Sequence, residues 1–66
     1  MIDFDYEGVQ NNQMAFRERS TGTYFFLPTT PLGDVHLLEG DQVRFAGLGD
    51  YCEHTWSIRD RRRVAD

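Results

Sequence analysis

Cysteine is nearly absent from this sequence of 66 residues, in which Cys52 is the only thiol. One thiol excludes an intramolecular disulfide framework and leaves too few sulfur ligands for a cysteine-based zinc site. No stretch of the chain approaches the roughly 18 apolar residues that a membrane-spanning helix needs. The first residues also lack the basic region and the apolar run of a signal peptide. We therefore expect a cytoplasmic protein, with no membrane partner, that packing alone stabilises.

Lysine is missing, so all seven cationic side chains are arginines. Arginine presents a planar fork to carboxylates and phosphates and stacks on aromatic rings, which suits recognition; a GC-rich genome is the alternative explanation. Residues 1–58 contain three arginines and nine acids, net −6, whereas 59–66 contain four arginines and two acids, net +2. The sequence predicts an acidic domain over 1–58 followed by an arginine-rich tail over 59–66. Acidic charge on the domain weakens binding to nucleic acid.

Short runs of aromatic and β-branched residues, separated by turn residues, are typical of small all-β proteins. Residues 2–9 and 14–19 both alternate between apolar and charged side chains, which predicts a hairpin with a loop at 10–12. In this register opposite charges face each other across the two strands. The predicted opposite-charge pairs are Asp3 with Arg19 and Asp5 with Arg17.

Further strands are predicted after this hairpin, at 24–27, 35–38, 42–46 and 51–58. In the first of them Phe25 and Leu27 enter the core, while Tyr24 and Phe26 lie over the arginines of the preceding strand. The sequence therefore predicts an all-β fold, a small five- or six-stranded, mostly antiparallel barrel of the OB-like or SH3-like kind.

The end of the chain allows two interpretations. As a strand, 51–58 places Cys52, His54, Trp56 and Ile58 on one face, which predicts that Trp56 is buried. The alternative is a short C-terminal helix over 51–64, because Asp50 and Glu53 have the spacing of a capping box.

Candidate catalytic and metal-binding residues are few. Cys52, Glu53 and His54 contain the residue types of a nucleophilic site, but on a strand Glu53 points away from the other two. His36, Cys52 and His54, with Asp34 or Asp50, lack a recognised zinc spacing. Gly47 and Gly49 lack the third glycine of a nucleotide-binding loop, so they indicate a turn. We predict no catalytic set, no metal and no cofactor.

Two surfaces are candidates for binding. The acidic row of Asp3, Asp5 and Glu7 suits a basic protein surface, and the leading hypothesis is a non-enzymatic module that docks on a protein, as a phage-type or regulatory inhibitor or adaptor. The alternative is a single-stranded nucleic-acid (RNA) binding protein that stacks bases on aromatic rings. Unpaired strand edges can also pair with a second copy of the chain, which makes a homodimer a further alternative. The residues of the nucleic-acid alternative are Arg17, Arg19, Tyr24, Phe26, Arg61, Arg62 and Arg63.

Residues 37–45, LLEGDQVRF in one-letter code, resemble the entry to the fourth strand of small OB-fold proteins. These are cold-shock domains and the single-domain bacterial translation initiation factors. The order of Gly8-Val9, Phe16-Arg17 and Thr21-Gly22 before an arginine-rich end is similar to the initiation factors across most of the chain. The resemblance implies an OB barrel that binds RNA. The same Gly-Asp-x-Val strand recurs in SH3-like barrels, including phage head–tail connector proteins.

Overall fold

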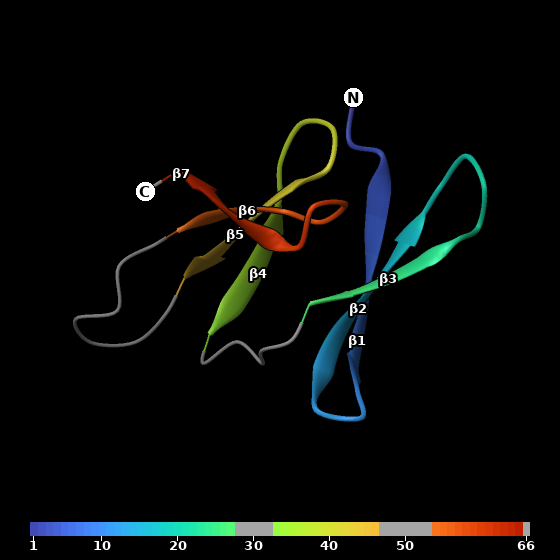
Figure 1. Cartoon of the computed structure of the whole chain (residues 1–66), viewed down its shortest axis with the longest axis horizontal. Helices are drawn as coiled ribbons and strands as arrows, with labels where there is room; N and C mark the ends of the chain where they lie inside the picture. The colour runs from blue at the N-terminus through green and yellow to red at the C-terminus, as the bar shows by residue number, and fades with distance from the viewer. Residues whose placement is uncertain (28–32, 47–53, 66) are drawn as a thin grey trace.

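The computed structural model describes residues 1–27, 33–46 and 54–65, which form two antiparallel sheets (Figure 1). One sheet has three strands in the order β1-β2-β3, and the other has four in the order β4-β5-β6-β7. The two sheets occupy separate halves of the molecule, β1 to β3 on the right of Figure 1 and β4 to β7 on the left. The strands are β1 (Phe4–Gln10), β2 (Gln13–Glu18), β3 (Tyr24–Leu27), β4 (Asp34–Leu37), β5 (Gln42–Ala46), β6 (Thr55–Ser57) and β7 (Arg62–Ala65).

The all-β prediction is confirmed, and the first five predicted strands lie within two residues of β1 to β5. The predicted single barrel is not confirmed: the described residues form seven strands in two sheets, and neither sheet closes on itself. A C-terminal helix is wrong, since 55–57 and 62–65 are strands. None of the described residues belongs to a helix long and apolar enough to cross a membrane.

The hairpin of β1 and β2 keeps the predicted register only in its first half. Asp5 lies opposite Arg17, but beyond Tyr6 the register shifts by one residue, so that Glu7 and Gly8 together face one residue of β2. Gly8 has a φ of +90°, a conformation that glycine tolerates in such a bulge. The turn is shorter than predicted, because Asn11 and Asn12 adopt φ values of 52° and 63°. Two residues of positive φ make the tight turn that suits strand twist.

The hydrophobic core joins the two sheets. Its fully buried side chains come from β1, β2 and β3 on one side and from β5 and the residue after β6 on the other. Gly40 adds a backbone link, since it forms a parallel bridge with Ile2 and accepts a 3.1 Å hydrogen bond from the Asp3 amide. The two sheets therefore share one core. Its members are Phe4, Met14, Phe16, Leu27, Val43 and Ile58.

Trp56 is half-buried, not fully buried as the alternation predicts. Its ring packs against the core and lies 5.9 Å from the Phe45 ring centroid. The side chains on the other face of β6, Thr55 and Ser57, are the buried ones, with 7% and 5% of their surface exposed. Alternation therefore predicted the face of Trp56 correctly, since it lies opposite the core residue Val43, but it did not predict that the other face of β6 is buried as well.

Candidate functional site

One face of the β1-β2-β3 sheet collects most of the residues that the sequence proposes for binding. Asp5, Arg17 and Tyr24 lie directly opposite one another across the three strands. Side chains opposite one another in a sheet share a face, and residues two apart on a strand share it too. We name this face, away from Phe4 and Phe16, the outer face. Its charged and aromatic residues are Asp5, Glu7, Arg17, Arg19, Tyr24 and Phe26, and the small Ala15 lies buried opposite Phe26.

The aromatic rings of the outer face form a pair. The Tyr24 and Phe26 rings stack with centroids 6.4 Å apart and an interplanar angle of 19°. Tyr24 keeps 46% of its surface exposed, and Phe26 is half-buried. By contrast Phe25 and Leu27 point into the core, as the sequence predicts. The alternation of β3 thus divides its apolar residues between the core and an accessible aromatic pair.

Arg17 lies beside this aromatic pair. Its side chain is exposed, and a Cβ placed at Gly22 would lie 3.8 Å from its Nη2 atom. The guanidinium therefore extends from β2 toward the start of β3, where Tyr24 begins that strand. Its positive charge also helps to lower the pKa of Asp5.

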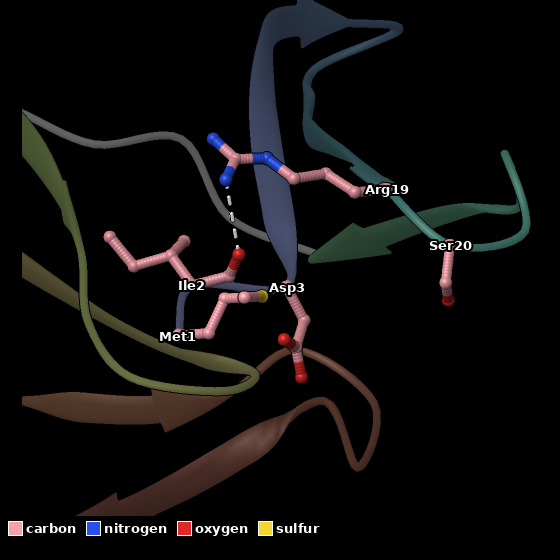
Figure 2. Close-up of a pocket in the computed structure, with 5 residues that line it drawn as sticks. All are labelled: Met1, Ile2, Asp3, Arg19 and Ser20. Carbon is pink, nitrogen blue, oxygen red and sulfur yellow. Dashed lines mark hydrogen bonds between the residues drawn. The ribbon is translucent and has the colours of Figure 1, made fainter.

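Asp5 is held by a different arginine from the one predicted. Arg19 donates hydrogen bonds to its Oδ1 atom from Nε at 3.0 Å and from Nη2 at 2.7 Å. These bonds hold the pKa of Asp5 below its usual value and raise the pKa of Arg19. Arg19 also donates to the Ile2 carbonyl at 3.1 Å (Figure 2). One carboxylate of the predicted acidic row is therefore already neutralised.

Asp3 does not form the predicted side-chain pair with Arg19. The two residues are joined through the backbone, where the Arg19 amide donates to the Asp3 carbonyl at 2.8 Å. In Figure 2 the Asp3 carboxylate points away from the Arg19 guanidinium. Both residues line a hollow of about 260 Å³ with Met1, Ile2 and Ser20. Of the acidic row, Asp3 thus lies at the joint of the two sheets, and Glu7 is exposed on the outer face.

The basic residues near the chain end divide into two groups. Arg61, in the turn before β7, lines a hollow of about 290 Å³ together with Gln13, Phe26 and Asp60. Arg62 and Arg63 belong to β7, in the other sheet, where they lie opposite Ser57 and Trp56. The structure therefore brings Arg61 near the outer face but keeps Arg62 and Arg63 in the second sheet.

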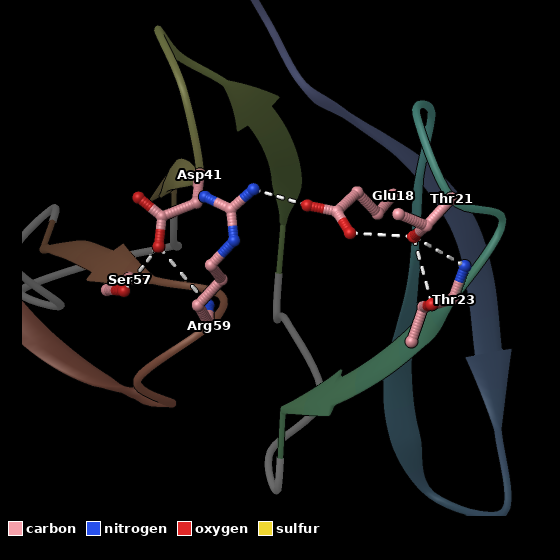
Figure 3. A network of polar contacts seen from close by, with 6 residues as sticks. All are labelled: Glu18, Thr21, Thr23, Asp41, Ser57 and Arg59. Carbon is pink, nitrogen blue, oxygen red and sulfur yellow. Dashed lines mark hydrogen bonds and ion pairs between the residues drawn. The ribbon is translucent and has the colours of Figure 1, made fainter.

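A polar network that the sequence did not reveal connects the two sheets (Figure 3). Glu18, only 11% exposed at the end of β2, forms an ion pair with Arg59, which follows β6. The Thr21 hydroxyl donates to Glu18 Oε1 at 2.7 Å, and the Arg59 amide donates to Asp41 Oδ2 at 3.2 Å. The Arg59 guanidinium also lies 5.1 Å from the centre of the Phe4 ring. We call Glu18 and Arg59 the inter-sheet latch.

The sequence assigns Arg59 to the basic tail, whereas the structure pairs its exposed guanidinium with Glu18 of the first sheet. The sequence contained one signal of this ion pair. Glu18 occupies a core-facing position two residues after Phe16. A carboxylate on the buried face of a strand needs a cationic or hydrogen-bonding partner. Only the tertiary structure identifies that partner, because Glu18 and Arg59 are 41 residues apart.

We predict that Glu18→Gln makes the Tm of the protein less sensitive to acidification. Hydrogen bonds from Thr21 and then from Arg59 hold the pKa of Glu18 below its ordinary value. A lowered pKa stabilises the fold above the ordinary carboxyl pKa, and this stabilisation is lost as pH falls through the folded-state pKa. The variant should have a lower Tm than the parent at neutral pH, and the difference should shrink toward about pH 3.

The matched control for this experiment is Glu7→Gln, because Glu7 is an exposed carboxylate on the neighbouring strand. Thermal unfolding followed by circular dichroism measures Tm for all three proteins. A Tm difference for Glu18→Gln that stays the same at both pH values, or equals that of Glu7→Gln, would contradict a role for the ionised latch.

The candidate catalytic and metal-binding residues are only partly described. Cys52, Glu53 and Asp50 lie outside the described residues, as does the predicted turn at 47–49. Histidine 54 is described, and its Nε2 atom lies 3.1 Å from Nη1 of Arg63. Within 1–27, 33–46 and 54–65 the structure brings no three histidine, cysteine or acidic side chains into a metal-binding group.

Comparisons of the chain with protein-family models, with curated proteins and with solved structures found no match. The resemblance to OB-fold and SH3-like proteins therefore stays a hypothesis.

Proposed function

We propose that this protein is a non-enzymatic binding module that docks on a protein partner through the outer face of the β1-β2-β3 sheet. The observation that carries the proposal is the stacked pair of the exposed Tyr24 and the half-buried Phe26 beside the extended Arg17 side chain. Tyrosine, phenylalanine and arginine are enriched at protein interfaces, where a few such side chains contribute most of the binding energy.

The charges of the outer face favour a protein over a nucleic acid. The face carries two carboxylates, on Asp5 and Glu7, and two guanidinium groups, on Arg17 and Arg19, so its formal net charge is zero. Non-specific binding to nucleic acid needs a cationic surface that releases counterions from phosphates. A face of balanced charge with aromatic residues matches the composition of a protein interface better.

Single-stranded RNA remains the second candidate ligand, because the stacked rings of Tyr24 and Phe26 can also accept bases. An OB-like barrel, as the sequence resemblance implies, would agree with that function. In this second proposal Arg17 and Arg61 would contact phosphates on either side of the rings. Its weakness is the balanced charge of the outer face, which offers few cations to a row of phosphates.

A photo-crosslinking amino acid tests the proposed surface directly. Placed at position 24, on the outer face, it should yield a discrete protein adduct in a lysate of the cells that produce this protein. The matched control carries the same group at Val64, which is 43% exposed in the second sheet. Equal adducts from both positions, or none from position 24, would contradict docking through the outer face.

Titration with a single-stranded oligonucleotide at two salt concentrations separates the two candidates. We expect no saturable binding at either salt concentration if the ligand is a protein. Binding that tightens strongly at low salt and weakens in a Tyr24→Ala variant would favour the RNA candidate.

A further inference from the structure

The free edge of β3 lies next to the aromatic pair. The Glu18 amide donates to the Thr23 carbonyl at 2.8 Å, so this pair of residues is hydrogen-bonded between β2 and β3. Hydrogen-bonded pairs alternate along an antiparallel ladder. The backbone groups of Thr23, Phe25 and Leu27 therefore point toward β2, and those of Tyr24 and Phe26 point toward the opposite edge. Among the described residues β3 pairs with β2 alone.

The hydrogen bonds between β2 and its other neighbour, β1, support this assignment. The Arg19 amide donates to the Asp3 carbonyl at 2.8 Å, so the odd-numbered residues of β2 face β1. The even-numbered residues then face β3, in agreement with the Glu18 bond. The rings of Tyr24 and Phe26 thus lie on the outer face. Their backbone N–H and C=O groups, which do not bond to β2, point toward the free edge of β3.

Two arginines lie near the two ends of β3. At the start of β3 the Arg17 guanidinium lies beside Gly22, and toward its end Arg61 shares a hollow of about 290 Å³ with Phe26. Within the described part of the chain neither arginine forms an ion pair with a carboxylate. The nearest acids are Asp5, which Arg19 already pairs, and Asp60, which lines the hollow with Arg61. At physiological salt the Debye length is about 8 Å, so these nearby groups, and not the acids farther away, set the potential at β3.

We propose that the docking partner contributes an extended acidic segment, which joins the sheet as a fourth strand along β3. This inference depends on the proposed function and specifies its ligand. Strand addition uses the outward backbone groups of Tyr24 and Phe26. Alternate side chains of the added strand lie on the outer face, where carboxylates reach Arg17 at one end and Arg61 at the other. The intervening side chains lie beside Phe25 and continue the core face.

Charge complementarity selects this occupant over a second copy of the chain. Two β3 strands paired antiparallel about a two-fold axis would set the start of one strand beside the end of the other. Arg17 of one copy would then approach Arg61 of its partner, and like charges placed close together oppose association. An acidic segment places opposite charges at both positions.

An acetylated and amidated heptapeptide of alternating glutamate and valine is the probe, added to the full chain labelled with nitrogen-15. We expect amide hydrogen exchange at Tyr24 and Phe26 to slow at least about tenfold at saturation, because both amides gain a partner. Exchange at Phe25, whose amide already faces β2, should change little. Unchanged exchange at Tyr24 and Phe26 with bound peptide overturns strand addition.

Two peptide controls separate the backbone from the charge. The same heptapeptide, N-methylated at every second residue, retains its side chains but loses the edge hydrogen bonds and should not bind measurably. A heptapeptide of alternating lysine and valine should bind at least about fivefold more weakly. Equal binding of the N-methylated peptide overturns strand addition, and equal binding of the lysine peptide overturns the acidic assignment.

Protein variants test the two arginines. Arg17→Gln and Arg61→Gln should each weaken binding of the glutamate peptide by roughly two- to fivefold. Arg62→Gln, at an exposed arginine of β7, is the matched control and should leave binding unchanged. A loss equal in all three variants overturns the proposed positions of the carboxylates.

The failure of this inference is distinguishable from failure of the proposed function. A protein adduct from position 24 together with unprotected edge amides would retain docking through the outer face and overturn strand addition. Slowed exchange at Tyr24 and Phe26 in the protein alone, increasing with its concentration, would overturn the acidic segment in favour of a second copy.

Discussion

Replacing Phe4 with alanine is expected to unfold a large fraction of the protein at room temperature. Phe4 is fully buried, contacts Phe25 edge to face at 5.5 Å between centroids, and carries the Arg59 guanidinium over its ring. Truncating a buried phenylalanine to alanine costs about 3–5 kcal/mol. A domain of this length is stable by only about 3–10 kcal/mol in total.

Urea denaturation followed by circular dichroism measures this effect, with two substitutions for comparison. Phe4→Leu retains most of the apolar volume and should cost about 1–2 kcal/mol. Val64→Ala, at a side chain that is 43% exposed, should remain within about 0.5 kcal/mol of the parent. If Phe4→Ala and Val64→Ala unfolded at the same urea concentration, that result would contradict the role of Phe4 as a stabilising residue of the core.

A chain that ends at Arg61 is expected to melt well below the parent. It lacks β7 (Arg62–Ala65), so β6 loses its second partner and the buried side chains of Thr55 and Ser57 become more accessible. Each backbone hydrogen bond contributes about 0.5–1.5 kcal/mol, and the lost ladder therefore corresponds to about 2 kcal/mol or more. For a domain of this length that shift lowers Tm by about 8–16 °C.

A chain that ends at Ala65 is the control, because it keeps every residue of β7. Its Tm should equal that of the parent in a thermal scan. For a chain that lacks residues 61–66 the sequence alone predicts the opposite result, a Tm within a few degrees of the parent, since 59–66 has few apolar residues to bury. If removal of β7 lowered Tm by only a few degrees, the result would support the prediction that the chain end is a tail.

The first three strands were predictable because their information is local. Alternating side chains in β1 and β2, and the apolar run of β3, specify strand positions and faces with no reference to distant residues. The register from Phe4 to Tyr6 follows from matching these faces. The bulge at Gly8 was not predictable, because Asn11 and Asn12 form a shorter turn that moves the second half of the ladder by one residue.

The second sheet was predicted only in part, since β4 and β5 fall close to their predicted ranges but the pairing of 62–65 with β6 was missed. The residues from Arg62 to Ala65 do not alternate between apolar and polar side chains, so the sequence does not predict a strand there. Strand β7 forms because it pairs with β6. In the candidate site, the sequence correctly placed Tyr24 over an arginine of β2, which is Arg17, but Phe26 lies opposite Ala15 and not opposite an arginine. The sequence treated the acidic row as a separate surface, yet the hairpin places Asp5 on the same face, where Arg19 neutralises it.

The inter-sheet latch has a consequence for the order in which the protein folds. The β1-β2-β3 sheet is a meander whose neighbours in space are neighbours in sequence, so its contacts close short loops. Glu18 and Arg59 are 41 residues apart, and their contact must close a much longer loop at a greater entropic cost. The meander can therefore form early, whereas docking of the second sheet through Arg59 completes the structure. Substitutions at the latch should then act mainly on the unfolding rate and leave the folding rate nearly unchanged.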